Sequence, residues 1–218
     1  MNSSVLSFLS DLQLHNDREW FQKNKQRYEE AKNEFEVTVN HLIAGISKFD
    51  DSVKYLVAKD CMFRIFRDVR FSNDKSPYKT NFGAWMSKGG RKHSGPGYYL
   101  HIQPGESFIA GGVYMPDPDT LKKIRQEIFY NLEEFSNILE EKKAKKLFGG
   151  LDEFDKGKLP PKGYPKDFAG IDYLKNKHFI LTMKLNDNDI VAADFLKKTI
   201  SGFEAMKGFQ EFLRKAVE

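Results

Sequence analysis

The sequence predicts an α+β fold, with an antiparallel-dominated sheet of about five strands flanked by N-terminal and C-terminal helices. Apolar residues recur at helical spacing over the first 48 residues, at a period of two from about Asp60 to Met115, and at helical spacing over much of the remainder. Because strands do not alternate with helices, a parallel nucleotide-binding sheet is not expected. A chain of 218 residues with 40% hydrophobic content can build one substantial core, so a single domain over residues 1–218 is expected.

Two helical runs open the chain. The apolar positions of the first run are Val5, Leu6, Leu9 and Leu12. Asn16 is then the expected N-cap of the next helical segment, because Glu19 follows three residues later and completes a capping box. A longer amphipathic run extends from Tyr28 to Ile46.

Five segments have the composition of strands: CMFRIF, TNFGAWMS, GYYLHIQ, ESFIAGGVYM and KHFILTMKL. The third and fourth flank Pro104-Gly105, which predicts an antiparallel hairpin with a type II turn. Alternation then divides the hairpin between two faces. One face carries Tyr98, Leu100, Ile102 and Ile109, and the other carries Tyr99, His101 and Phe108.

The second half of the chain is mostly helical. Asp117 precedes Pro118, an N-cap followed by proline at the first helical position, and an apolar stripe continues as far as Leu139. Residues 142–177 are rich in Lys, Gly and Pro and predict an irregular connection held down by Tyr164 and Phe168. Asn186 or Asp187 is expected to cap the C-terminal helical region.

Positive charge is concentrated in one segment. The chain has a formal net charge of +4, yet residues 61–92 alone contain eight basic and two acidic residues, a local +6. The remaining residues are therefore slightly acidic, at −2. Such a moderate overall charge does not imply nucleic-acid binding, whereas the local concentration favours an anion site.

A cytoplasmic location is expected. The N-terminal residues lack the basic region of a secretory signal, and no apolar run approaches the roughly 20 residues of a membrane span. The lone Cys61 cannot form an internal disulfide, and its apolar surroundings predict a small buried hydrophobe rather than a catalytic thiolate.

The basic segment carries the motif R-x-x-R-D-x-R-F, three residues, then K-x-P-Y-K-x-N, over Arg64 to Asn81. This motif resembles domain of unknown function 2461, a widespread bacterial family, and the later stretch GYYLHIQPGESFIAGGVYMPDPDTLKKIR is similar to that family as well. The resemblance implies a cytoplasmic, single-domain protein and assigns no activity.

The motif predicts a site for a small phosphate- or carboxylate-bearing ligand. Arginine forks and lysine point charges around an aromatic hydroxyl are typical of oxyanion recognition. The candidate ligand-binding residues are Arg64, Arg67, Asp68, Arg70, Lys75, Tyr78, Lys79, Asn81 and His101, with Lys92 at the rim. Asp68 lies among cations and is expected to be ionised, as an orienting partner. Arg67 falls on an apolar face, so either a bulge redirects it or it meets a carboxylate.

Three other interpretations stay open. The same site could belong to an enzyme acting on an anionic substrate, with Asp68 or His101 transferring a proton. The charges could instead form a structural ion-pair network, with the true site elsewhere. Nucleic-acid binding beyond weak nonspecific contact is unlikely on this charge distribution, and no membrane contact is expected.

No cofactor and no metal site are expected. The five histidines show no metal-ligand spacing. The glycine-rich loop GGRKHSGPG lacks the lysine-hydroxyl order of a phosphate loop and predicts a flexible hairpin connection.

Overall fold

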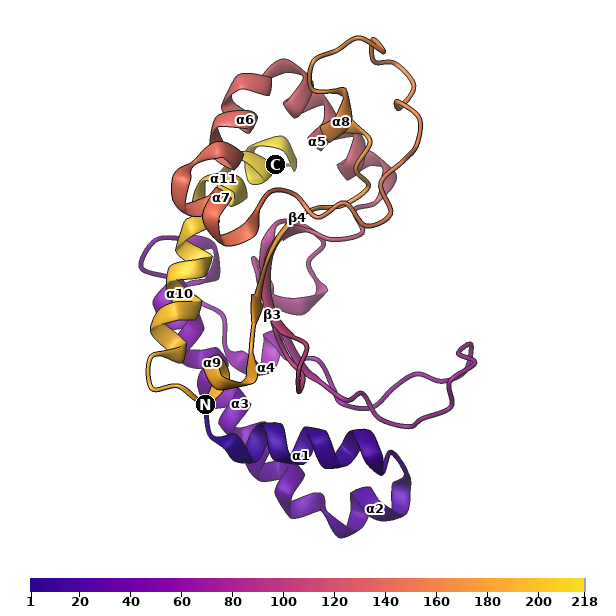
Figure 1. Ribbon diagram of the computed structural model, residues 1–218, viewed down its shortest axis with the longest axis vertical. Coiled ribbons are helices and arrows are strands. Elements are labelled where there is room, and N and C mark those ends of the chain that lie inside the picture. The colour runs from indigo at the N-terminus through magenta and orange to yellow at the C-terminus, as the bar shows by residue number, and fades with distance from the viewer. Residues whose placement is uncertain (218) are drawn as a thin grey trace.

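The computed structural model describes residues 1–217 and contains a four-stranded antiparallel sheet in the order β1-β2-β3-β4. The strands are β1 (Phe82–Ser87), β2 (Gly97–Ile102), β3 (Ser107–Val113) and β4 (Phe179–Leu185). Helices cover one face of the sheet (Figure 1), while the other, open face lines a hollow that contains a cavity. The α+β class and the antiparallel sheet are confirmed, but the expected number of about five strands is one too high.

The predicted strand that the described residues do not form is CMFRIF. Its beginning belongs to the short helix α4 (Ala58–Cys61), and the rest pairs only through isolated bridges, Met62 with Ala84 and Phe66 with Tyr78. The physical cause is a change of register. Phe63 N–H donates to Gly83 O, whereas the N–H of Lys79 donates to the carbonyl of Ile65, so two extra residues lie on the second side. This bulge prevents a continuous ladder.

The hairpin of β2 and β3 has the predicted geometry. Leu100 lies opposite Ile109, and His101 lies opposite Phe108, which confirms both predicted faces. The turn between them closes with a hydrogen bond from Glu106 N–H to Gln103 O, and Gly105 has φ of +73°, as a type II turn requires.

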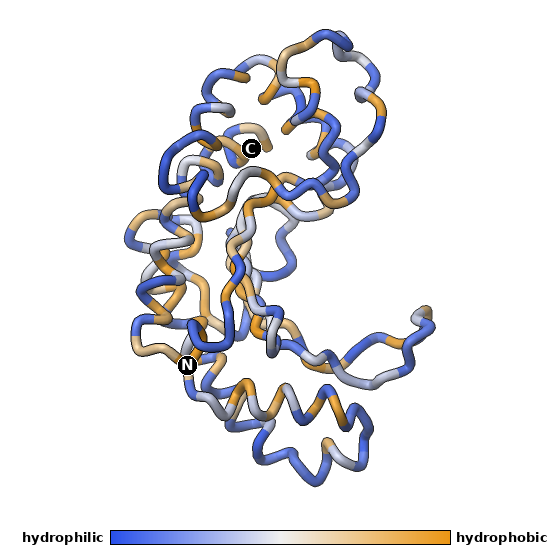
Figure 2. The backbone as a smooth tube through the Cα atoms, in the orientation of Figure 1, coloured by the Kyte–Doolittle hydropathy of each residue, from blue (hydrophilic) through white to orange (hydrophobic). Residues whose placement is uncertain are grey.

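Three helices begin the chain: α1 (Ser3–Leu14), α2 (Arg18–Lys23) and α3 (Lys25–Ile46). Hydrophobic and hydrophilic residues alternate along α1, as an amphipathic helix requires (Figure 2). The predicted cap of α2 is wrong by one residue, because Asp17 accepts the hydrogen bond from Trp20 N–H. Asn16 instead pairs with the backbone of Tyr78, both donating to its carbonyl and accepting from its N–H.

Helices also follow the third strand and the fourth. They are α5 (Pro118–Tyr130), α6 (Leu132–Glu140), α7 (Lys142–Phe148), α8 (Ile171–Leu174), α9 (Asp187–Val191), α10 (Phe195–Ala205) and α11 (Lys207–Val217), and the 3₁₀ turns are η1 (Asp51–Val53) and η2 (Gly90–Lys92). Asp117 caps α5 and Asn186 caps α9, both as predicted. The apolar stripe that runs to Leu139 is divided between two helices at Asn131. Tyr164 and Phe168 pack on Phe129 and hold down the long irregular connection.

The helical layer approaches the sheet closely. A Cβ on Gly202 of α10 would lie 2.5 Å from Ile109 Cδ1, and one on Gly45 of α3 would lie 2.4 Å from Ile200 Cδ1. Glycine at these positions brings α10 down onto β3 and against α3. The apolar residues buried here form one cluster that extends from Val5 to Leu213. Among residues 1–217, no helix is both long and apolar enough to cross a membrane.

Candidate functional site

The open face of the sheet is built from alternate residues of its four strands. Trp85 of β1 lies opposite Tyr99 of β2, Tyr99 lies opposite Ala110 of β3, and Ala110 lies opposite Thr182 of β4. In the adjoining row, His101 lies opposite Phe108. Because side chains at a period of two share one face, these residues form a continuous and largely aromatic floor.

Two glycines allow the largest rings to lie flat on this floor. A Cβ on Gly83 would lie 2.6 Å from Tyr99 Oη, and a Cβ on Gly97 would lie 2.8 Å from Trp85 Cζ2. Each ring therefore occupies the space that a side chain on the neighbouring strand would take. The result is a floor of aromatic rings, with Tyr99 tilted at 54° to Phe108, against which the ring of a ligand can pack.

The floor and the residues that border it line a cavity of about 630 Å³. Its lining consists of Phe63, Trp85, Arg91, His93, Ser94, Tyr99, His101, Phe108, Ala110, Tyr114, Asp152, Phe154, Ile180 and Thr182. One wall is a cluster of three rings, in which buried His178 packs on Tyr114 and Phe154 at centroid distances of 5.2 and 4.5 Å, and the Tyr114 and Phe154 rings lie 6.0 Å from each other. Such a volume and such a lining are typical of sites for small molecules.

His101 is held by three neighbours. Its Nδ1 lies 3.1 Å from Tyr99 Oη and 3.4 Å from Asn81 Nδ2, and its Nε2 lies 3.1 Å from Gln103 Oε1. Burial lowers the pKa of His101, and its ring stacks on Phe108 at 4.7 Å. The Asn81 amide donates to Nδ1 and Gln103 accepts from Nε2, so the bonding pattern fits a neutral ring whose nitrogens are both engaged.

The motif Arg64–Asn81 forms most of an arm, residues 62–81, that projects from the sheet beside the hollow (Figure 1). Most of the predicted ligand residues near its tip are bonded to other groups of the arm. Arg67 forms an ion pair with Asp74 and also donates to Ser72 Oγ. Arg70 donates two hydrogen bonds to the Asp68 carboxylate, from Nε at 2.9 Å and from Nη2 at 2.6 Å.

Further contacts occupy the remaining predicted residues near the tip. Lys75 Nζ donates to Val69 O at 3.1 Å. The side-chain and backbone hydrogen bonds from Arg70 lower the pKa of Asp68, as expected for an orienting carboxylate. Tyr78 is buried and stacks on Phe21 with a centroid distance of 3.9 Å, so its ring packs in the core.

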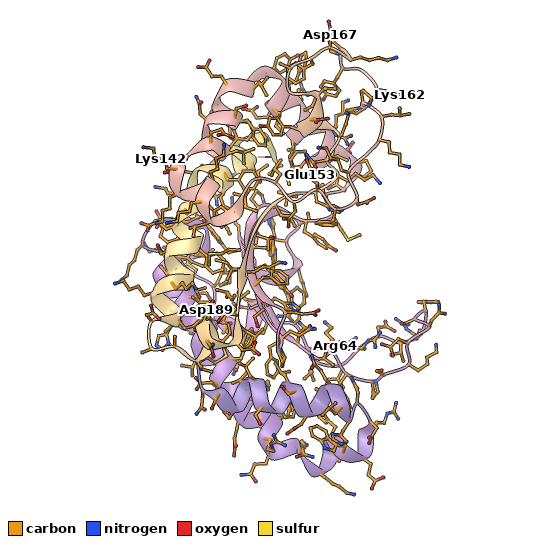
Figure 3. The ribbon with its side chains drawn as sticks, viewed as in Figure 1. Arg64, Lys142, Glu153, Lys162, Asp167 and Asp189 are labelled. Carbon is orange, nitrogen blue, oxygen red and sulfur yellow. The ribbon has the colours of Figure 1, made fainter. Side chains whose placement is uncertain are left out.

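The base of the arm is different, because its cations lack carboxylate partners among residues 1–217. Arg64 is exposed and forms no ion pair or hydrogen bond within that range, and Lys79 Nζ lies 5.4 Å from the centroid of the Phe63 ring. Burial and the charge of Arg64 lower the pKa of Lys79. Figure 3 places Arg64 where the arm leaves the sheet, facing the hollow. Arg91, on the cavity wall, donates only to Lys59 O.

Of the predicted residues, His101 lines the cavity and Asn81 contacts it, whereas Lys79 lies over the lining residue Phe63 and Arg64 follows Phe63 in the chain, both outside the lining. The cavity residues that the sequence interpretation did not assign to the site include Trp85, Asp152 and Thr182. The period-two pattern could have assigned Trp85 to the site, because its position differs by six from that of Lys79 and by four from that of Asn81. Asp152 carried no such signal, since it lies in an irregular segment. Lys92, predicted at the rim, is outside the lining, and its neighbour Arg91 is within it.

The described residues include no group of three or more His, Cys, Asp or Glu side chains that could hold a metal ion. Comparison with known proteins returns one family: a family model described as "Conserved hypothetical protein (DUF2461)" matches residues 4–212. No curated protein and no solved structure matches the chain.

Proposed function

The chain belongs to the DUF2461 family that its basic motif predicted, and we propose that the open face of its sheet binds a small molecule combining a planar ring with a phosphate or carboxylate group. The ring stacks on the floor of Trp85, Tyr99 and Phe108. The anionic group lies at the base of the arm, beside Arg64 and Lys79. The observation that carries the proposal is the position of these cations without carboxylate partners, among the described residues, next to an aromatic cavity of about 630 Å³.

The energetics favour the base of the arm over its tip as the anion site. Arg67 and Arg70 already have carboxylate partners, so a ligand would have to displace Asp74 or Asp68 to gain them. Lys79 is partly desolvated without such a partner. An incoming anion recovers that cost and forms a charge-assisted bond.

Binding is better supported than catalysis. Asp68 is held ionised by Arg70 and does not line the cavity. His101 does line it, but both of its ring nitrogens lie within hydrogen-bonding distance of protein groups. A proton-transfer role would require one of those contacts to break when a substrate enters.

Tryptophan fluorescence and thermal stability test the proposal together. Trp85 lies on the cavity floor and Trp20 lies outside it, so Trp20→Phe leaves one tryptophan that reports on the cavity. The probes are aromatic phosphates and carboxylates, matched with non-aromatic anions and with neutral aromatics. A probe at 100 times its dissociation constant should stabilise the fold by about 2.7 kcal/mol. We expect only probes with both groups to shift the melting temperature and the Trp85 emission.

Charge variants locate the anion. Arg64→Gln and Lys79→Gln should each reduce the affinity for an aromatic anion about tenfold. Arg70→Gln, near the arm tip, and Lys142→Gln, on α7 away from Arg64 (Figure 3), should leave this affinity unchanged. Loss of binding in Arg70→Gln would move the anion site to the tip. If no aromatic anion binds to the parent protein, the proposed function is wrong.

A further inference from the structure

Opposite charges lie on two sides of the cavity: Arg64 and Lys79 lie outside its lining, next to the lining residue Phe63, and Asp152 is part of the lining. Arg64 and Lys79 lie beside β1, where the arm begins. Asp152 lies beyond β4, at the other edge of the sheet, where its N–H donates to Ile180 O. With strands about 4.8 Å apart, the three intervals between β1 and β4 span roughly 14 Å, and the two charged groups lie just outside this span. The aromatic floor fills the distance between them.

Asp152 is placed to accept hydrogen bonds from a ligand. Thr182 Oγ1 donates to its Oδ2 at 2.7 Å, which fixes the carboxylate against the floor. Asp152 is half-buried and forms no ion pair with any of residues 1–217, and its Oδ1 has no bonding partner there. A carboxylate that is partly desolvated and held by one hydroxyl retains unused acceptor positions.

The chemistry of the whole cavity therefore describes a polar ligand with three parts in order. One end presents N–H donors to Asp152, the middle is a flat ring system, and the other end is anionic. Among common small molecules, a nucleoside monophosphate whose base carries adjacent ring N–H and amino donors has this arrangement. Guanine offers such an edge to a carboxylate, and adenine does not, because the ring nitrogen beside its amino group is an acceptor.

We propose that the cavity selects nucleotides with a donor edge, of the guanine type, and that Asp152, oriented by Thr182, is the residue that reads this edge. The inference rests on the proposed function, since it assigns a ligand class to the same site.

Affinity measurements with four probes test this selection: GMP, AMP, guanosine and ribose 5-phosphate. For the parent protein we expect GMP to bind about tenfold or more tightly than AMP, because a carboxylate that meets an acceptor loses its hydrogen bonds. Guanosine and ribose 5-phosphate, each lacking one end of the ligand, should both bind more weakly than GMP.

Two variants assign the selection to Asp152. Asp152→Asn should reduce GMP affinity about tenfold and leave AMP affinity unchanged or higher, since the amide offers both a donor and an acceptor. Thr182→Val, which keeps the shape but removes the orienting hydroxyl, should narrow the GMP preference without abolishing binding. Glu153→Gln is the matched control, because Glu153 is exposed and paired with Lys156. Circular dichroism spectra verify that each variant is folded.

The possible failures of the two proposals are distinguishable. Equal affinity for GMP and AMP, or a GMP preference that survives Asp152→Asn, would overturn the nucleotide selection while the effects of Arg64→Gln and Lys79→Gln still upheld the anion site. If other aromatic anions bind and neither nucleotide does, the ligand class is wrong and the site stands. If nothing with a ring and an anionic group binds, both proposals fail.

Discussion

Asp50 is a buried carboxylate that ties the C-terminal helix to the sheet. Its Oδ2 accepts hydrogen bonds from Tyr98 Oη and Arg214 Nη2, each at 2.8 Å. Burial opposes its ionisation, but the hydrogen bonds from Ser52, Tyr98 and Arg214 outweigh burial, so the pKa of Asp50 lies below its usual value. A lowered pKa in the folded state contributes stability above the unfolded pKa of about 3.9, and this stability is lost as the pH falls through the folded value.

Asp50→Asn should therefore reduce the free energy of unfolding at pH 7 by about 3 kcal/mol, because Arg214 is left partly buried without a carboxylate. The same variant should lose less further stability than the parent when the pH falls below about 4. Chemical denaturation at pH 7 and in the acidic range measures both effects. Asp51→Asn, at the exposed neighbouring position, should change neither. A parallel acid profile for Asp50→Asn and the parent would contradict this role.

Cys61 should be unreactive in the folded protein. Burial, with the charge of Asp60 adding to it, raises the pKa of the thiol to about 11, and the side chain is fully buried. Since the thiolate is the reactive species, labelling by a disulfide reagent at pH 8 should be slow and should accelerate sharply in denaturant. Rapid labelling without denaturant would show that the region around α4 opens in the native state.

At the scale of elements, the arm of residues 62–81 combines an anchored base with a solvated tip. The base is held by the Asn16 amide against Tyr78, and the Tyr78 ring stacks on Phe21. The tip buries little, and Phe71 is 96% exposed. Its ion pairs are also solvated, and such pairs add little to the stability of the fold because water screens them.

Replacing residues 68–76 with Asn-Gly, a two-residue hairpin turn between Arg67 and Pro77, should therefore leave the melting temperature nearly unchanged. Arg67 N–H already donates to Pro77 O, so the backbone ends lie at the spacing that a tight turn spans. Binding of an aromatic anion should also persist, because Arg64 and Lys79 are retained. Thermal melts and probe titrations of the shortened protein measure both. Lost binding with an intact fold would show that the tip contributes ligand contacts.

At the scale of the whole molecule, we expect residues 1–218 to unfold as a single domain. The buried apolar residues form one cluster that joins the N-terminal helices to the sheet and to the C-terminal helices. Trp20 in α2 packs against this cluster and Trp85 in β1 lies on the cavity face of the sheet, so the two report on different parts of the molecule. The single-tryptophan variants Trp20→Phe and Trp85→Phe should show one coincident fluorescence transition each, matching far-ultraviolet circular dichroism. If the two variants instead unfolded with different transition midpoints, the chain would consist of two separate cooperative units.

The charge of the whole molecule argues against tight binding to nucleic acid. A net charge of +4 is modest, and the aromatic rings line a walled cavity rather than a long basic track. We expect only weak, nonspecific affinity for single- or double-stranded DNA and RNA at physiological salt. Titrations of labelled strands at about 50 and 200 mM salt test this, since phosphate contacts lose affinity steeply over that range. Sub-micromolar binding of a labelled strand at the higher salt concentration, if it disappears in Lys79→Gln, would identify the aromatic floor as a surface that binds single-stranded nucleic acid.

Local sequence determined the parts of this protein that depend on neighbours in the chain. The period of two assigned Tyr99, His101 and Phe108 to one face, because successive side chains of a strand point to opposite sides. The caps at Asp117 and Asn186 were equally local. The motif from Arg64 to Asn81 identified the family that the comparison confirms.

Tertiary structure decided what depends on segments that are distant in the chain. The cavity joins Trp85 to Asp152 and Thr182, and only the packing of β4 and the irregular segment beside it brings them together. Packing also left Arg64 and Lys79 without carboxylate partners among the described residues, whereas Arg67 and Arg70 pair with Asp74 and Asp68 within the arm. The physical reason is that periodicity fixes the direction of a side chain relative to its own strand, whereas the partner it meets is set by how separate elements pack in space.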